Sequence, residues 1–181
     1  SELATAIAGL TPESAIEITG KVVLNPMVKM DGLEVVAESI SVTGKADTPL
    51  PLSENSTMET RLDWRFLDLR NRKNLLVFQL QTAVEHAMRS FWMSEGFVEI
   101  HSPKFMGSES ESGAELFEVK YFDRKAYLAQ SPQFYKQMAM AAGFDRVFEI
   151  GPVFRANPSF TSRHDTEFTS VDVEVSWVRS H

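Results

Sequence analysis

The residues that could do chemistry gather near the end of the chain, in the stretch GPVFRANPSFTSRHDTEFTSVDVE at 151–174. Arg155 closes an apolar run, and Arg163 and His164 stand in the polar loop that follows. A guanidinium presents a planar fork of donors that suits phosphate oxygens. One basic group on a strand and two in the adjoining loop therefore predict a hairpin that faces an anion. The alternative is that Arg155 keeps its charged head in water at the surface.

The strand after this loop alternates two kinds of side chain. Because successive side chains of a strand point to opposite faces, one face would be polar and the other rich in valine. The valine face is expected to pack on a helix or on another layer. The polar face is either exposed to solvent, as in most antiparallel sheets, or one wall of a site. Its members are Phe168, Ser170, Asp172 and Glu174, opposite Thr169, Val171, Val173 and Val175.

A second candidate is the segment QSPQFYKQ at 130–137, which is typical of the start of a helix. Ser131 suits the N-cap and Pro132 suits the first turn. Gln133 and Lys136 are three residues apart, so they share a face of that helix. The free N–H groups and partial positive charge of a helix start would hold a small carboxylate, with Lys136 as the partner charge. An ordinary capped amphipathic helix is the alternative.

Acidic residues precede this helix, and Glu111 stands among them in the polar segment 104–117. A glutamate in this loop would either pair with the ammonium group of a ligand or simply keep the loop in solution. The four histidines have no metal-ligand spacing, and the chain contains neither a Walker loop nor a GxGxxG sequence. A nucleotide site here would therefore not be of a glycine-loop type.

The composition is that of an ordinary globular protein without cysteine. Of the 181 residues, 43% are apolar and 24% are charged, which argues against disorder. No apolar run approaches the roughly 20 residues of a membrane span, and the first residues do not resemble a secretory signal. The lack of cysteine excludes disulfides and thiolate metal sites and fits a reducing cytoplasm.

The net charge of −7 means that any contact with nucleic acid needs a local basic patch. The densest basic segment is RLDWRFLDLRNRK at 61–73. The alternative for this segment is a solvated linker in which Asp63 and Asp68 are internal partners of the arginines.

Hydrophobic patterning predicts the elements of the first half. Apolar and polar residues alternate at 14–24 and 32–44, which predicts two strands that need further structure to be stable. A Pro- and Ser-rich connector at 46–56 is the expected boundary. A long helix is predicted at 73–96, with Gly96 as its stop. Its apolar stripe comprises Leu76, Val77, Leu80, Val84, Ala87, Met88, Phe91 and Trp92.

The second half is predicted to be mostly antiparallel strands with an inserted helix, an arrangement typical of an α+β fold. Gly143 would end that helix. The expected elements are a strand at 97–103, a hairpin at 117–130 turning at Asp123–Arg124, a helix at 131–143, a strand at 146–156 kinked at Gly151–Pro152, and a strand at 167–178.

Several of these segments resemble motifs of a known family. FVEIHSPKF resembles motif 1 of the class II aminoacyl-tRNA synthetases, and FRA…SRHDTEFTSVDVE resembles their motif 2. QSPQFYKQ is similar to the amino-acid-binding helix of the aspartyl-tRNA synthetase family, and ESGAELFEVKYF looks closest to its archaeal and eukaryotic branch. The resemblance runs through about residues 60 to 177.

The resemblance implies a class II antiparallel sheet flanked by helices, preceded by the end of an OB-type β-barrel. Residues 1–50 would be the C-terminal part of the anticodon-binding barrel, 51–72 a linker, and 73–181 the N-terminal part of the catalytic domain with motifs 1 and 2. The implied activity is the ATP-dependent conversion of aspartate to aspartyl-adenylate and its transfer to tRNA. ATP would be a substrate, and Mg²⁺ would accompany it.

The resemblance also implies roles for single residues. Arg155 would be the catalytic arginine at the α-phosphate of ATP, with His164 and Arg163 near the β- and γ-phosphates. Phe168 would stack on adenine. The residues implied at the aspartate end are Ser131, Gln133 and Lys136, which would hold the substrate with Lys136 on its side-chain carboxylate, Glu111 near its ammonium group, and Ser170, Asp172 and Glu174 as the wall of the pocket.

Two departures from the family pattern stand out. The family usually has a glutamate two residues after the motif 2 arginine, at the adenine amino group, and here that position is Asn157. Motif 3 and the family's metal-binding carboxylates are expected beyond His181, so no metal ligand is expected within this chain. The chain would then be a partial synthetase, or a truncated relative that binds a nucleotide, an amino acid or a partner without aminoacylation.

The expected partners are aspartate, tRNA and a second copy of the chain. The homodimer would form through the motif 1 helix and strand, and a dimerisation module without catalysis is a further alternative. Among synthetases the asparaginyl type and then the lysyl type are the next candidates. Lys136 favours an acidic substrate over both, because a buried lysine needs a carboxylate partner rather than an amide.

Overall fold

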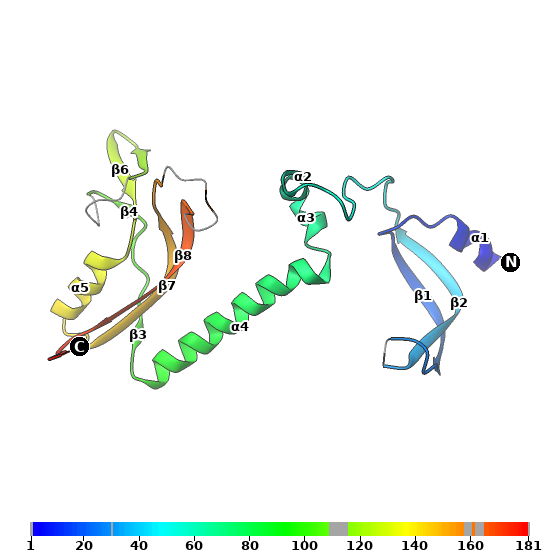
Figure 1. Cartoon of the computed structure of the whole chain (residues 1–181), viewed down its shortest axis with the longest axis horizontal. Helices are drawn as coiled ribbons and strands as arrows, with labels where there is room; N and C mark the ends of the chain where they lie inside the picture. Colours follow the sequence, from blue (N-terminus) through cyan, green and yellow to red (C-terminus); the bar gives the residue numbers. More distant parts are fainter. Residues whose placement is uncertain (1, 30, 109–115, 158–160, 162–164, 181) are drawn as a thin grey trace. The chain divides into compact units, whose positions relative to one another are not determined.

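The computed structural model describes residues 2–29, 31–108, 116–157, 161 and 165–180. The chain divides into two compact units, Ser1–Asn74 and Leu75–His181. Figure 1 traces the helices and strands of both units in chain order. Within the described residues, no helix combines the length and apolar character that crossing a membrane requires.

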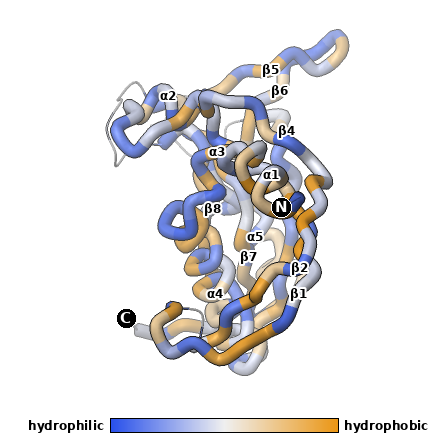
Figure 2. The backbone as a smooth tube through the Cα atoms, turned by 90° about the vertical axis from the view of Figure 1, so that its right-hand side faces the viewer, coloured by the Kyte–Doolittle hydropathy of each residue, from blue (hydrophilic) through white to orange (hydrophobic). Residues whose placement is uncertain are grey.

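The first unit begins with the helix α1 (Glu2–Ala8) and an antiparallel strand pair, β1 (Ala15–Leu24) and β2 (Leu33–Gly44). Both strands lie where alternation predicted them, and Figure 2 colours long stretches of them as hydrophobic. The register shifts just before Gly20, and a Cβ built there would lie 2.2 Å from the carbonyl oxygen of Val36. Glycine is therefore required for the two backbones to approach so closely.

The segment expected to be a linker contains two short helices, α2 (Met58–Asp63) and α3 (Arg65–Asp68). The hydroxyl of Thr57 accepts a hydrogen bond from the N–H of Thr60 at 3.3 Å and so caps α2. Hydrophobic periodicity missed both helices because neither is long enough to show a repeating apolar stripe.

Asp68 is buried at the end of α3, where it organises the basic segment around it. Arg61 Nε donates to Asp68 Oδ1 at 2.7 Å, Arg65 contacts the other oxygen, and Asn74 Nδ2 donates to Oδ1 at 2.9 Å. The hydrogen bond from Arg61, and its positive charge, hold the pKa of Asp68 below its ordinary value. The alternative in which acidic residues of this segment are internal partners of its arginines is thus confirmed for Asp68, whereas the described ion pairs do not include Asp63.

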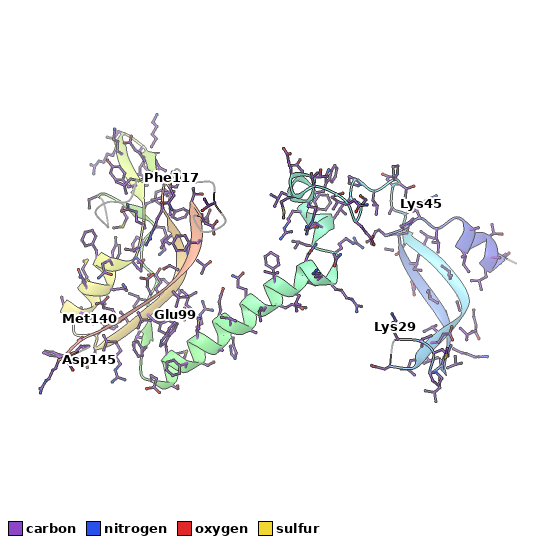
Figure 3. All side chains as sticks on the ribbon, viewed as in Figure 1. Lys29, Lys45, Glu99, Phe117, Met140 and Asp145 are labelled. Carbon is purple, nitrogen blue, oxygen red and sulfur yellow. The ribbon has the colours of Figure 1, made fainter. Side chains whose placement is uncertain are left out.

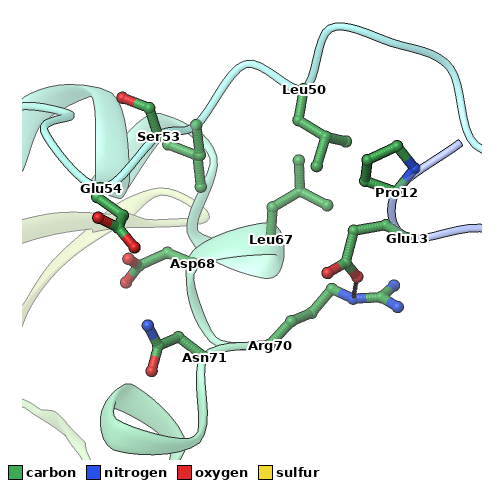
Figure 4. A pocket seen from close by; sticks show the side chains of 10 residues that line it. Pro12, Glu13, Leu50, Ser53, Glu54, Leu67, Asp68, Arg70 and Asn71 are labelled. Atoms are coloured by element: carbon green, nitrogen blue, oxygen red, sulfur yellow. Dashed lines mark ion pairs between the residues drawn. The ribbon is translucent and has the colours of Figure 1, made fainter.

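A hollow of about 650 Å³ lies within the first unit, between the chain around Glu13, the connector and α3. Figure 4 shows Leu50 and Leu67 pointing into it, with Pro12 beside them. At its rim Arg70 Nε lies 2.6 Å from a carboxylate oxygen of Glu13. Both of these charged side chains are substantially exposed, so their ion pair contributes little to stability.

The helix α4 (Arg72–Ser94) crosses the boundary between the units, and Gly96 follows it with a φ of 80°. The helix and its glycine stop are as predicted. Near the end of α4, Arg89 Nε donates to Glu99 at 3.0 Å, and this hydrogen bond raises the pKa of Arg89. Most of the predicted apolar stripe is exposed: Leu76, Val77, Leu80, Val84 and Phe91 are open to solvent in the chain.

The main sheet of the second unit has the order β3-β7-β8. Its central strand β7 (Arg146–Phe154) pairs in parallel with β3 (Val98–Glu99) and antiparallel with β8 (Glu167–Val175). The register of β7 with β8 continues through Gly151 and Pro152. The predicted kink is therefore absent, because both residues keep their places in the strand pair.

A second sheet has the order β4-β6-β5, formed by β4 (Phe105–Met106), β6 (Arg124–Leu128) and β5 (Glu118–Tyr121). The hairpin of β5 and β6 was predicted, but its turn is Phe122–Asp123, one residue earlier than expected. Phe122 has a φ of 54°, a left-handed conformation that is uncommon for an aromatic residue. A phenylalanine in the sequence therefore gives no signal for this turn.

The two faces of the main sheet differ. On one face Trp92 of α4 packs on the fully buried Phe148, with ring centroids 5.1 Å apart. The valine side of β8 belongs to this face but is only partly covered, and Val171 is 42% exposed beside a hollow of about 310 Å³ under α4. The expectation that a helix or another layer packs on the valine face is therefore only partly met, because a hollow lies between Val171 and the middle of α4.

The helix α5 (Gln133–Ala141) lies on the other face of the sheet. It begins at Gln133, so Pro132, predicted in the first turn, occupies the N-cap position in place of the predicted Ser131. Ser131 Oγ still accepts the Gln133 N–H at 3.3 Å, and the helix ends before Gly143, whose φ is 95°. Near its end Met140 Sδ lies 2.9 Å from the hydroxyl of Ser176, just after β8. Met140 and Asp145 are labelled at this end of the helix in Figure 3.

Candidate functional site

One face of the β7–β8 pair carries the candidate site. In the antiparallel register Glu149 faces Asp172, Gly151 faces Ser170 and Val153 faces Phe168. Directly opposed residues project to the same side of a sheet, so these pairs form consecutive rows of one surface. The polar side chains of β8 on this surface are more buried than Val171 and Val175 on the reverse. This finding favours a site over a solvent-exposed outer face.

Lys136 projects from the first turns of α5 onto this surface. It is only 5% exposed, and its Nζ lies 3.2 Å from Asp172 Oδ1 and 3.4 Å from Glu174 Oε2. The hydroxyl of Ser170 donates to the other oxygen of Asp172. A buried ammonium requires such partners. The structure thus brings together four of the predicted residues, with the lysine held by protein carboxylates.

The chain just before α5 is the most deeply buried polar segment near the site. Gln130, Ser131 and Pro132 are all buried, and Gln133 is half-buried at the helix start. The buried hydroxyl of Ser131 points its oxygen at the Gln133 N–H. Ser131 and Gln133 therefore lie at the positive end of α5, next to the Lys136 cluster, as the sequence predicted.

Arg155 and Phe168 meet at the other end of the same surface. The guanidinium carbon of Arg155 lies 5.5 Å from the centroid of the Phe168 ring, a cation–π contact, and Arg155 Nε donates to the carbonyl of Gln130 at 3.4 Å. Phe168 is separated from Asp172 by four residues of extended strand, which is about 13 Å. The predicted anion-binding arginine and the aromatic residue thus occupy one end, and the lysine cluster occupies the other.

Asn157 lies just past β7, in the position where the family pattern has glutamate. Its N–H donates to the carbonyl of Arg155 at 2.8 Å, and its Nδ2 donates to the carbonyl of Asp165 at 3.4 Å. The side-chain amide therefore spans the two ends of the loop. The ionised side chain of a glutamate has no N–H to donate to the Asp165 carbonyl, so asparagine at this position changes how the two sides of the hairpin are joined.

The residues between β6 and α5 connect the two ends of the site through the main chain. The N–H of Ala129 donates to the carbonyl of Lys104 at 3.0 Å, and the carbonyl of Ala129 accepts from the N–H of Phe154 at 2.9 Å. The next carbonyl, of Gln130, accepts from Arg155. The start of α5 and the end of β7 are therefore held in one hydrogen-bonded arrangement.

Sequence reasoning missed two charged residues on this surface, Lys104 and Glu149. Lys104 Nζ lies 2.6 Å from Glu149 Oε1 and 3.0 Å from the hydroxyl of Ser102, while Glu149 is 2% exposed. The N–H of Ser102 donates to the second oxygen of Glu149 at 3.2 Å. The available signal was a lone glutamate within the apolar run RVFEIGPVF, because an unpaired charge there would be very costly.

Three predicted residues, Glu111, Arg163 and His164, lie outside the described residues. Within the described part of the chain, no three His, Asp or Glu side chains converge in the manner of metal ligands. Asp172 and Glu174 already contact Lys136. These carboxylates do not fit a Mg²⁺ site, since that ion needs oxygen ligands that are free to coordinate it.

Comparisons with known proteins identify the family of the chain. The profile of the family described as "tRNA synthetases class II (D, K and N)" matches residues 57–181. The chain therefore belongs to this family of class II tRNA synthetases. The α+β fold with antiparallel sheets is also that of its structural neighbours.

Among curated relatives, the chain is 46% identical to an aspartate–tRNA(Asp) ligase of Pyrococcus horikoshii, over 99% of this chain and 42% of the relative. It is 48% identical to an aspartate–tRNA(Asp/Asn) ligase of Methanopyrus kandleri, over 94% of this chain and 40% of the relative. The chain thus spans about two fifths of the length of the relatives it matches.

Two solved structures extend the comparison. An asparaginyl-tRNA synthetase from Pyrococcus horikoshii, complexed with asparaginyl-adenylate, superposes with a TM-score of 0.91 at 32% identity, over 98% of this chain and 41% of that one. A protein described as a putative aspartyl-tRNA synthetase from Leishmania major superposes with a TM-score of 0.86 at 35% identity, over 96% of this chain and 35% of that one.

Proposed function

We propose that this chain is the part of an aspartate–tRNA ligase that holds aspartate and ATP during formation of aspartyl-adenylate. The observation that carries the proposal is the surface of β7 and β8, which bears a buried lysine cluster at one end and an arginine stacked on an aromatic ring at the other. The names of the curated relatives support aspartate as the amino acid. The adenylate in the related asparaginyl structure supports an aminoacyl-adenylate as the ligand of this fold.

At the amino-acid end, Ser131, Gln133 and Lys136 would bind the substrate. Lys136 would donate to the side-chain carboxylate of aspartate, and the free N–H groups at the start of α5 would face its other oxygens. Asp172 and Glu174 hold the lysine in place and, with Ser170, form the wall of the pocket. Glu111 is proposed near the ammonium group of the substrate.

At the nucleotide end, Arg155 would bind the α-phosphate and Phe168 would stack on adenine. A guanidinium that packs on an aromatic face still presents its edge donors to phosphate oxygens. Asn157 would offer its side-chain carbonyl to the adenine amino group while Nδ2 bonds to Asp165. Arg163 and His164 are proposed at the β- and γ-phosphates.

The proposed reaction joins the two ends of this surface. An oxygen of the aspartate α-carboxylate attacks the α-phosphorus, the new P–O bond forms, and the bond to the β-phosphate breaks with its electron pair leaving on pyrophosphate. The chain contributes positioning and neutralisation of the developing negative charge, which are the main requirements of such a transfer. Mg²⁺ would arrive with ATP. A hydroxyl at the 3′ end of tRNA would then attack the carbonyl carbon of the adenylate, and the bond to the phosphate oxygen would break with its electron pair leaving on AMP.

A second candidate is an asparaginyl enzyme, and one observation favours it. Lys136 is already held by two carboxylates, so one positive and two negative charges leave the cluster with a net charge of −1. An amide could accept from Lys136 and donate to Asp172 or Glu174, whereas a carboxylate would meet net repulsion unless a further cation joined the pocket. The identity of the curated relatives favours aspartate over this alternative.

The proposal can be tested by calorimetric titration of the chain with non-hydrolysable aspartyl- and asparaginyl-adenylate analogues. We expect binding of the aspartyl analogue and weaker binding of the asparaginyl analogue. Aspartate-dependent exchange of pyrophosphate into ATP, measured in parallel, tests whether this chain carries out activation by itself. A flat titration with both analogues would refute the proposed site, and stronger binding of the asparaginyl analogue would replace aspartate by asparagine.

We propose in addition a homodimer that forms through α4 and β3, and a cytoplasmic location. The dimer is supported by the exposed apolar side chains of α4, including Leu80 and Phe91, because such a contiguous surface usually marks an interface. Sedimentation equilibrium should give twice the chain mass. A monomer at high concentration would contradict the proposal, and Leu80→Glu should shift a dimer toward monomer.

A further inference from the structure

Lys104 lies at the middle of the site surface, and its described contacts do not use all of its N–H donors. Its ammonium group has three N–H donors. Two of them are directed at Glu149 Oε1, at 2.6 Å, and at Ser102 Oγ, at 3.0 Å. Both oxygens of Glu149 are in turn satisfied, by Lys104 and by the Ser102 N–H. The described contacts therefore leave one N–H of Lys104 available for a ligand.

Gly151 shows on which side of the sheet this ammonium lies. A Cβ built on Gly151 would lie 3.7 Å from Lys104 Nζ and 3.0 Å from Glu149 Oε1. The missing side chain of Gly151 points to the same face as Ser170, its partner in the register. Lys104 Nζ therefore lies on the face that carries Lys136 and Asp172.

Of the three rows on this surface, the row of Gly151 and Ser170 has the smallest side chains. It lies between the row of Asp172 and the row of Phe168, which places it between the proposed amino-acid and nucleotide ends. The side chain of Lys104 is 21% exposed, whereas that of Lys136 is 6% exposed. A ligand can thus reach Lys104 across the row of Gly151 and Ser170, because these small side chains leave space above the sheet.

We propose that Lys104 is a ligand-binding residue whose third N–H donates to an anionic oxygen at the centre of the site, where the α-carboxylate meets the α-phosphate. This inference rests on the proposed function. Both groups offer an oxygen of the same chemistry, and a charge-assisted hydrogen bond suits either. Glu149 acts as a positioning residue, because it orients the ammonium over Gly151 and balances its charge.

The opposite charges of Lys104 and Glu149 determine which substitutions can isolate the proposed contact. Removing Lys104 alone leaves the Glu149 carboxylate buried, unpaired and facing an anionic ligand. The variant Lys104→Met would therefore lose affinity and stability for two reasons at once. The double variant Lys104→Gln/Glu149→Gln is neutral and keeps hydrogen-bonding groups at both positions, so it removes the charged donor without leaving a buried charge.

The experiment is calorimetric titration of the chain and its variants with three probes: a non-hydrolysable aspartyl-adenylate analogue, aspartate alone and AMP alone. We expect the double variant to unfold at a temperature close to that of the wild type and to bind the analogue at least tenfold more weakly. A loss confined to aspartate assigns the oxygen to the carboxylate, and a loss confined to AMP assigns it to the phosphate. The matched control is Lys125→Gln/Glu118→Gln, which removes the exposed pair on β5 and β6 and should leave binding unchanged.

A second variant, Gly151→Ala, tests the same point while keeping both charges of the ion pair, and its methyl group would displace Glu149 Oε1, at 3.0 Å, by only a few tenths of an ångström. Gly151→Ala places a methyl group in the space that the ligand oxygen would occupy, 3.7 Å from Lys104 Nζ, so we expect at least a tenfold loss of affinity for the analogue. If the wild type binds the analogue while both the double variant and Gly151→Ala bind it equally well, Lys104 contacts no ligand and the inference is wrong. If the wild type binds none of the probes, the proposed function fails and this inference fails with it.

Discussion

The strand pairs β1–β2 and β7–β8 are both long and antiparallel, yet they bury opposite kinds of residue. No residue of β1 or β2 is buried, and apolar side chains such as Val22, which is 66% exposed, lie open. In β7 five residues are buried, and one of them is the charged Glu149. From hydropathy alone, Val22 would have been predicted to be buried and Glu149 to be exposed.

The difference follows from the position of each strand in its layer. β7 is the central strand of its sheet, with β3 and β8 as neighbours and with contacts from α4 on one face and α5 on the other. β1 and β2 form a two-stranded sheet in which each strand has a single neighbour. A charged residue can be buried where partners such as Lys104 surround it, and an apolar residue stays exposed where no layer covers it.

The largest expected effect comes from removing the buried lysine of the β7–β8 surface. Lys136→Met would leave Asp172 and Glu174 facing each other without a cation, and we expect the free energy of unfolding of the second unit to fall by about 3 kcal/mol. Urea denaturation followed by near-ultraviolet circular dichroism measures this. Gln137→Met, at an exposed position of the same helix, is the control and should change stability little. Equal stability of Lys136→Met and the wild type would mean that the contacts of Lys136 with Asp172 and Glu174 do not stabilise the fold.

A steric change should produce the next largest effect, in the exposed strand pair. Gly20→Ala places a methyl group against the Val36 carbonyl, and we expect a local loss of about 2 kcal/mol. Amide hydrogen exchange in β1 and β2 should accelerate by about thirtyfold, since 1.4 kcal/mol corresponds to a factor of ten. Gly44→Ala meets only the Ala15 side chain at 3.7 Å and should leave exchange unchanged. If both variants behave alike, the close approach at Gly20 does not constrain the pair.

An intermediate, pH-dependent effect is expected at Asp68. The folded protein lowers the pKa of Asp68 through the hydrogen bond and charge of Arg61, so its contribution to stability is present above the unfolded value of about 3.9 and is lost as the pH falls through the folded value. Asp68→Asn should therefore be less stable than the wild type at pH 7, and the gap should narrow below about pH 4. Thermal unfolding at several pH values measures this gap. Asp63→Asn, at an exposed position, is the control, and a gap independent of pH would contradict the assignment.

The smallest effect is expected for an ion pair on the open strands. Lys21 Nζ lies 3.3 Å from Glu38 across β1 and β2, with both side chains mostly exposed. Solvent and salt screen such a pair. Lys21→Gln should change the free energy of unfolding by less than about 0.5 kcal/mol, as measured by urea denaturation. A loss above about 1 kcal/mol would show that an ion pair on these exposed strands is not weakened by solvent.

Local patterns predicted much of this molecule because local rules governed those parts. The alternation at 167–175 predicted the polar surface of β8, and the glycines at 96 and 143 predicted two helix ends. These signals depend on residues close together in the sequence. The turn of the β5–β6 hairpin was misplaced by one residue because Phe122 adopts a conformation that its residue type disfavours.

The parts that were missed depend on residues far apart in the chain. Lys104 and Glu149 are separated by 45 residues, and only the sheet brings them together. The extent to which α4 covers Val171 depends on where that helix meets the sheet, which periodicity does not report. Glu149 could have been flagged as a buried charge in need of a partner, but the identity of that partner could not be read from the sequence.

The hydrogen bonds of Ala129 and Gln130 have a thermodynamic consequence. They attach the start of α5 to Phe154 and Arg155 through main-chain carbonyls. In the proposed site, a ligand that draws Ser131 toward itself would also shift the carbonyl that Arg155 contacts, so occupancy of the proposed amino-acid end would change the affinity of the proposed nucleotide end. Linkage then requires the nucleotide to change the affinity for the amino acid by the same factor. Because the acceptors are main-chain carbonyls, this coupling would not depend on the side chains of Ala129 and Gln130.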